Sequence, residues 1–173
     1  MRVSTAIGIS LLSVSIGGAA VIGQAGQRGR GGEGGTVILE KAPTDRSIPI
    51  PKEKLSQYLK DMDAKKLQTL RMIEGGRYNV NIRRITNAET ALIHPKTIDT
   101  WVVLDGSGTL TTGGKIVDGK IVGGVSHALK VGDVEFIPAC LPHGVSGVNG
   151  NITWLNIRWD VDWDSSYKCD SQP

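Results

Sequence analysis

Residues 91–108 read ALIHPKTIDTWVVLDGSG, and residues 131–147 read VGDVEFIPACLPHGVSG. Each segment combines short apolar runs with side chains that can bind a metal: His94 and Asp99 in the first, His143 in the second. Neutral imidazoles and a carboxylate suit divalent iron, manganese, zinc, nickel or cobalt. We therefore regard these three residues as candidate ligands of a divalent metal ion. The alternative is a barrel whose polar residues bind an organic ligand or satisfy one another.

Around these segments, the sequence predicts short strands separated by turns. Apolar residues alternate over 70–72 and 78–82, with a turn at residues 74–76, and Asn149-Gly150 predicts a hairpin turn. The chain has 23 glycines, many of them between short apolar runs. This regular succession is typical of an all-β sandwich or barrel. The further predicted strands are residues 90–94, 100–104, 108–112, 125–130, 134–138, 143–148 and 152–159.

One helix is expected ahead of the strands, at residues 52–62. Leu55, Leu59 and Met62 recur there at helical spacing, and Pro51 suits a helix start. We expect this apolar stripe to pack on the outside of a sheet. A chain of 173 residues has room for one domain with a substantial core.

The two ends of the chain are expected to lie outside that domain. Residues 1–25 have the features of a secretory signal peptide, because Arg2 precedes an apolar run of small residues; a membrane anchor is the alternative. Residues 26–45 predict a Gly-rich flexible linker and residues 164–173 a flexible tail. We expect a periplasmic or secreted protein with no stable membrane insertion once the signal is removed.

Charge and motifs exclude some classes of function. The formal net charge is only +3 and the basic residues are scattered, so no nucleic-acid partner is expected. No serine lies in a G-x-S-x-G setting, which argues against a metal-free hydrolase. The two cysteines, Cys140 and Cys169, match no C-x-x-C metal site, and the sequence leaves open whether they pair.

The first segment resembles the first conserved motif of the cupin superfamily, G-x5-H-x-H-x(3,4)-E-x6-G. His94 stands at its second histidine, Asp99 at its glutamate and Gly106 at its last glycine. Leu92 stands where the motif has its first histidine, so a four-ligand site is not expected.

The second segment resembles the second cupin motif, G-x5-P-x-G-x2-H-x3-N. Gly132, Pro138 and His143 match at full spacing, whereas Cys140 and Gly147 replace the motif glycine and asparagine. The resemblance implies an all-β cupin-type double-stranded β-helix, or jelly-roll barrel, with one short N-terminal helix. It implies a single domain over residues 46–163, with motifs at 91–108 and 132–147, an inserted hairpin near residues 115–124, and a homodimer.

Within that fold, Asp99, Trp101 and Val103 share one face of a strand. Three protein ligands leave positions on a metal open for water or substrate. The leading interpretation is an exported, metal-dependent oxygenase, isomerase or lyase that acts on a small oxygenated molecule. The alternatives are a non-catalytic ligand-binding barrel and a structural module. An inward Arg84 or Arg158 would favour an anionic substrate. The candidate pocket residues are Trp101, Leu92, Cys140 and Tyr78.

Overall fold

The computed structural model describes residues 36–161. Within that range no helix is both long and apolar enough to cross a membrane. The expected signal peptide and C-terminal tail lie outside the described residues, as does Cys169. The elements are, in order, β1 (Thr36–Lys41), α1 (Lys52–Ala64), β2 (Thr69–Glu74), β3 (Tyr78–Ile85), β4 (Thr97–Thr112), β5 (Lys115–Val117), β6 (Lys120–Val122), β7 (Val125–Lys130), β8 (Val134–Ile137), β9 (His143–Ser146) and β10 (Ile152–Asp160).

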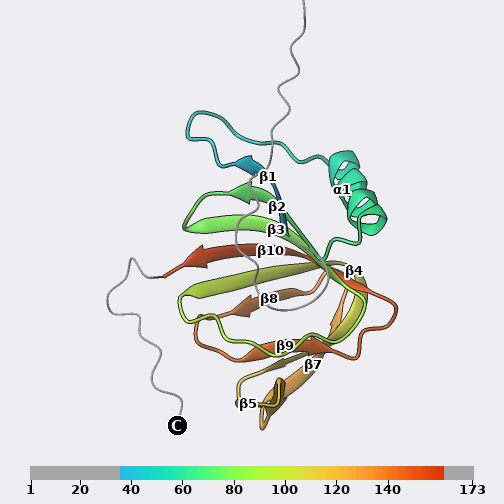
Figure 1. Ribbon diagram of the computed structural model, residues 1–173, viewed down its shortest axis with the longest axis vertical. Helices are drawn as coiled ribbons and strands as arrows, with labels where there is room; N and C mark the ends of the chain where they lie inside the picture. The colour runs from blue at the N-terminus through green and yellow to red at the C-terminus, as the bar shows by residue number, and fades with distance from the viewer. Residues whose placement is uncertain (1–35, 162–173) are drawn as a thin grey trace, which may run out of the picture.

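Strand β4 is shared by the two sheets of a barrel (Figure 1). Its first half pairs with β10 and β8, in a sheet of order β1-β2-β3-β10-β4-β8. Its second half pairs with β7 and β9. All pairings are antiparallel except that of β1 with β2. The all-β jelly-roll barrel with one short helix is confirmed.

Gly106 is the corner where β4 passes from one sheet to the other. Its φ is +74°, and a Cβ there would lie 1.9 Å from the carbonyl oxygen of Asn151. The opposing strand β10 also shifts its register beside this point. The prediction of separate strands at 100–104 and 108–112 is therefore wrong. The chain bends at the glycine without reversing, as strands do when they switch sheets.

Two other predicted turns have different outcomes. The inserted hairpin is confirmed as β5 and β6, whose turn places Asp118 at φ +49° and Gly119 at φ +74°. The prediction of a hairpin at Asn149-Gly150 is wrong, because the strands on its two sides do not pair with each other. Strand β9 pairs with β4, whereas β10 pairs with β3 and with the other half of β4. The strand expected at residues 90–94 is reduced to one bridge, between Leu92 and His143.

Strand β1 corrects the predicted linker, residues 26–45. Its residues pair in parallel with β2, and Ala42 continues the contact by donating its N–H to Glu74 O at 2.8 Å. Five of the six β1 residues are exposed. The strand is therefore held by main-chain hydrogen bonds rather than by side-chain burial, and such pairing leaves no clear trace in the hydropathy pattern.

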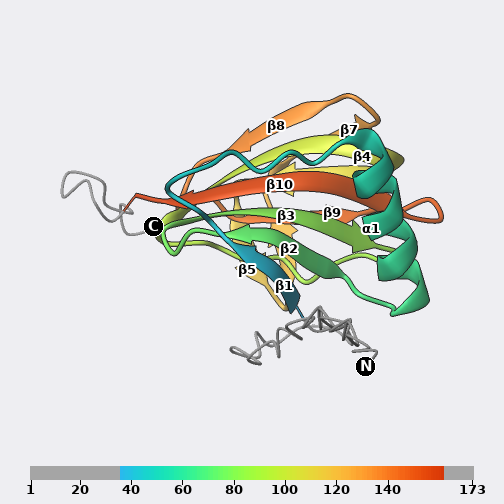
Figure 2. The same cartoon turned by 90° about the horizontal axis from the view of Figure 1, so that it is seen from above.

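Helix α1 packs on the outer face of β2 and β3, as expected (Figure 2). Met62 is fully buried against Leu70, Met72 and Ile82. Because side chains alternate along a strand, the next residue on each side of Ile82 points to the opposite face. Val80 and Ile82 therefore lie under the helix, whereas Asn81 and Arg83 face the barrel interior.

The barrel interior is apolar at one end and polar at the other. The apolar end is a cluster of buried residues that closes the barrel, and the polar end opens into a cavity. The members of the apolar cluster are Ile85, Trp101, Val103, Leu110, Leu129, Ile137, Val145, Ile152 and Trp154.

Candidate metal centre

The structure brings the three predicted ligands together at the polar end of the barrel. His94 lies in the loop before β4, Asp99 in β4, and His143 at the start of β9. One ligand atom from each residue falls in a group whose members all lie within 4.8 Å of one another. His94 Nε2 is 3.6 Å from Asp99 Oδ2, and the two imidazole rings are 5.2 Å apart between centroids.

Main-chain contacts fix the orientation of His143. Its N–H donates to Leu92 O, and the N–H of Leu92 donates to His143 O, both at 3.0 Å. In the side chain, Nδ1 lies 2.9 Å from Leu141 O. A carbonyl oxygen only accepts hydrogen bonds, so Nδ1 carries the proton and Nε2 keeps a lone pair. Such an outer hydrogen bond is typical of histidines that bind metals.

The loop that carries His94 is tied to Cys140. The N–H of Cys140 donates to His94 O at 2.8 Å. Cys140 has φ +71°, a left-handed conformation that suits the glycine found at this place in the cupin motif. Cys140 is also disulfide-bonded. Its contribution is therefore to hold the ligand loop, and it does not line the cavity beside the three ligands.

Arg158 lies directly across from Asp99 on the paired strands β10 and β4. Its Nε is 2.9 Å from Asp99 Oδ1, which makes an ion pair. This N–H is not aligned for a hydrogen bond, and both carboxylate oxygens are buried without a hydrogen-bond donor among the described residues. Asn156 and Trp101 lie close enough to favour the ionised form. Asp99 is thus surrounded by polar groups but satisfied by none of them.

Burial shifts all three ligands towards their neutral forms. Burial, together with the charges of Arg158 and His143, lowers the pKa of His94 from 6.5 to about 3. Burial also lowers the pKa of His143, against the opposing effects of the Leu141 carbonyl and of Asp99. It raises the pKa of Asp99, opposed chiefly by Arg158. Both imidazoles are therefore neutral near pH 7, the form that binds metals.

The ligands lie in a cavity of about 290 Å³. Strand register explains its walls, because Asn81, Asn156 and Trp101 are direct neighbours across β3, β10 and β4. The cavity is lined by three arginines against two carboxylates, which gives a formal charge of +1 with both histidines neutral. These charged residues are Arg71, Arg83, Arg158, Glu89 and Asp99.

The far end of this cavity is held by ion pairs. Arg71 pairs with Glu74, and its Nε donates to Asn81 Oδ1 at 3.1 Å. Arg83 pairs with Glu89, and its NH1 donates to Thr69 Oγ1 at 2.8 Å. Both guanidinium groups therefore have carboxylate partners within the protein.

Two of the four predicted pocket residues line the cavity and two do not. Trp101 and Leu92 line the cavity, whereas Tyr78 and Cys140 do not. Tyr78 shares its face of β3 with Ile82, which packs under α1, so its side chain is on the outer face and is 47% exposed. The alternation of residues 78–82 was detectable, but it does not tell which face is inside the barrel.

Strand β10 contributes three further lining residues; of these, Arg158 was considered from the sequence, which did not fix the face on which it lies. Trp154, Asn156 and Arg158 occupy alternate positions of β10 and all line the cavity. Polar residues at alternate positions usually indicate a solvent-facing side. Here they face inwards because the helix covers the outer face. Arg84, the other arginine considered, pairs outside the cavity with Asp63 and Asp105.

The donor set fits a divalent cation. A buried carboxylate without hydrogen bonds is costly, and a cation held by Asp99 Oδ2 would remove that cost. Metal–ligand bonds of about 2.1 Å allow two ligand atoms to be at most about 4.2 Å apart, slightly less than the spread in this structure. Small side-chain rotations of His94, the most exposed of the three ligands, would close that difference.

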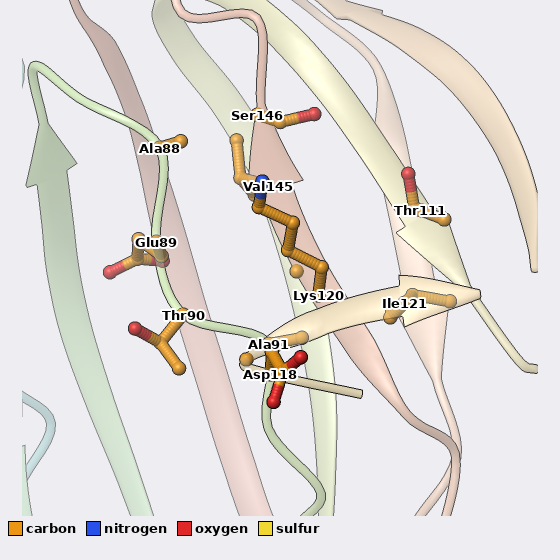
Figure 3. A pocket seen from close by; sticks show the side chains of 12 residues that line it. Ala88, Glu89, Thr90, Ala91, Thr111, Asp118, Lys120, Ile121, Val145 and Ser146 are labelled. Atoms are coloured by element: carbon orange, nitrogen blue, oxygen red, sulfur yellow. The ribbon is translucent and has the colours of Figure 1, made fainter. Parts of the chain in front are cut away.

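A larger cleft, of about 730 Å³, lies beside this cavity (Figure 3). Its walls are the segment that carries Glu89 and Thr90, the β5–β6 hairpin with Asp118 and Lys120, and Ser146 of β9. The cleft shares lining residues with the smaller cavity, among them Glu89 and Thr90, but contains none of the three candidate ligands. The smaller cavity is the candidate site, because the buried, unsatisfied polar groups of the described residues converge there.

Comparisons with known proteins bear on the fold. No family model and no curated protein sequence matches the chain. Among solved structures, a Bacillus halodurans protein, BH2720, is 16% identical with a TM-score of 0.51, over 68% of this chain and 83% of its own. A Klebsiella pneumoniae protein with a double-stranded β-helix domain is 18% identical with a TM-score of 0.44, over 55% and 79%. A cupin superfamily protein from Desulfitobacterium hafniense is 15% identical with a TM-score of 0.42, over 53% and 74%.

Proposed function

The chain has the double-stranded β-helix fold of the cupin superfamily, and we propose that it is a metal-dependent enzyme that acts on a small oxygenated molecule. One observation carries the proposal: Asp99 is 1% exposed, its carboxylate accepts no hydrogen bond from a described residue, and two neutral imidazoles lie beside it. A bound divalent metal would supply Lewis-acid or oxygen-activating chemistry at this place.

The residues of the chain have distinct tasks in this proposal. His94, Asp99 and His143 hold the ion and leave other positions open for substrate. Leu141 O keeps the proton on His143 Nδ1, so that Nε2 remains a ligand. Trp101 packs edge-on against the His143 ring, with centroids 6.0 Å apart, and excludes water from that side.

We also propose that the protein works in the periplasm or outside the cell. The signal-like residues 1–25 support this location, and so does the disulfide at Cys140, because disulfides persist mainly in oxidising compartments.

Metal content tests the proposal directly. We expect near-stoichiometric divalent metal in the purified chain by elemental mass spectrometry, and little in His143→Ala. His127→Ala is the matched control, because the third histidine is exposed and pairs with Glu135 away from the cavity. Absence of metal from the wild-type protein, even after reconstitution, would overturn the proposal. Metal binding without turnover of any small oxygenated compound would instead leave a ligand-binding barrel.

A further inference from the structure

The guanidinium group of Arg158 is only partly engaged by other groups of the protein. Its Nε faces Asp99, but its two terminal amino groups donate no hydrogen bond to any described residue. The side chain lines the cavity and is 21% exposed. A guanidinium fork that is fixed at one nitrogen and open at the other two is suited to bind a carboxylate in a bidentate manner.

We propose that the cavity takes a small carboxylate-bearing molecule, whose carboxylate binds the terminal amino groups of Arg158. This inference rests on the proposed function and names the substrate class of the same site. The carboxylate would lie beside the metal ligands, since Arg158 already contacts Asp99.

The other two arginines of the cavity are less suitable. Arg71 is engaged by Glu74 and by Asn81, and Arg83 by Glu89 and by Thr69. A ligand carboxylate at either position would have to compete with a carboxylate of the protein. The protein carboxylate beside Arg158 is that of Asp99, and a bound metal ion would take up part of its negative charge.

A second observation supports a ligand with acceptor oxygens. The indole Nε1 atoms of Trp101 and Trp154 are buried and donate no hydrogen bond to a described residue, although Trp101 lies close to the Asp99 carboxylate. Both tryptophans line the cavity, and they are 4% and 2% exposed. Two buried donors without acceptors are costly, and the cost is removed if a bound molecule brings oxygen atoms to them.

The volume and charge of the cavity limit the ligand further. A volume of about 290 Å³ lies at the small end of the range of about 300–1,000 Å³ that is usual for ligand pockets, so the ligand is small. The lining carries a formal charge of +1, which a divalent metal would increase. A small mono- or dicarboxylate satisfies both limits.

The test is calorimetric titration of the full chain loaded with Zn²⁺, which is redox-inert. The probes are pyruvate, lactate, malonate, succinate and benzoate, each compared with its neutral amide. We expect at least one carboxylate to bind with a Kd below about 1 mM, and its amide to bind at least about ten-fold more weakly. No binding by any of the five, or equal binding by acid and amide, would overturn the inference.

Variants assign the binding to Arg158. We expect Arg158→Gln to keep its zinc and to lose at least about ten-fold in carboxylate affinity. Arg158→Lys, which keeps the charge without the fork, should lose several-fold, and it replaces the glutamine variant if that one does not fold. Arg46→Gln removes an arginine whose side chain is 60% exposed and should change nothing. Unchanged affinity in both Arg158 variants would show that the carboxylate binds elsewhere.

Zinc content measured on the same samples separates the two hypotheses. Zinc without carboxylate binding overturns only the Arg158 inference. Absence of zinc from the wild-type chain overturns the proposed function, whatever the titration shows.

Discussion

Arg158 and Asp99 form an ion pair across β10 and β4, with Nε 2.9 Å from Oδ1, in which the Asp99 side chain is 2% exposed. Removing one partner of a buried pair leaves the other charge uncompensated, which typically costs about 3–5 kcal/mol. Since Arg158 is only partly buried, its loss of a partner should cost an amount near the lower end of that range.

A double-mutant cycle in the metal-free protein measures this pair. We expect Asp99→Asn to lower the free energy of unfolding by about 3 kcal/mol. Adding Arg158→Gln should recover part of that loss, with a coupling energy of about 0.5–3 kcal/mol. Urea denaturation of the four proteins provides the values. Strictly additive effects would show that the two charges do not interact.

Metal binding should raise the thermal stability of the protein. At a free metal concentration of 100 times the Kd, binding only to the folded state adds about 2.7 kcal/mol to the free energy of unfolding. For a domain of this size the melting temperature would rise by roughly 10 °C, and a chelator would reverse the change. Scanning calorimetry of the wild type and His127→Ala should show this rise. The same rise in His143→Ala would place the metal elsewhere.

The corner of β4 should tolerate no side chain. At Gly106 an alanine would combine a left-handed backbone with a Cβ 1.9 Å from Asn151 O, so we expect a loss of more than about 4 kcal/mol or failure to fold. Gly76 has a similar φ of +79° but open space around its Cα, and Gly76→Ala should cost only about 1–2 kcal/mol. Denaturation curves compare the two. Similar costs for both would mean that the backbone shifts to relieve the clash at the corner.

The apolar end of the barrel should carry much of the stability. Leu110 is fully buried, and Leu110→Ala should cost about 2–5 kcal/mol through lost burial and the resulting void. Leu39, on β1, is 40% exposed, and the same substitution there should cost less than about 1 kcal/mol. Chemical denaturation with a common m-value gives both numbers. An equal cost at Leu39 would show that β1 is more deeply packed than its exposure indicates.

Much of the fold was accessible from the sequence. Period-two alternation and glycine turns located β7, β8, β9 and β10 to within about two residues, since these strands follow local rules. The errors in strand boundaries arise where a strand depends on partners that are distant in the sequence. The parallel strand β1 depends on an open edge of β2, and the continuity of β4 depends on the partner strands at Gly106.

The candidate ligands were also accessible, because motif spacing assigns His94, Asp99 and His143 to neighbouring strand ends. The residues that line the cavity around these ligands were harder to predict from the sequence. Tyr78 was expected inside and is outside, whereas Asn81 was not selected and lies inside. Alternation separates the two faces of a strand but does not orient them.

By itself, then, the sequence determined the strand pattern, the single helix and the three residues that converge at the candidate metal centre. Only the tertiary structure decided which face of β3 and β10 lines the cavity. The physical reason is that α1 covers the apolar outer face, and this turns Asn156 and Arg158 inwards. The pairing of Arg158 with Asp99 follows from the register of two strands and joins residues 59 positions apart in the chain, a long-range relationship that local patterns do not encode.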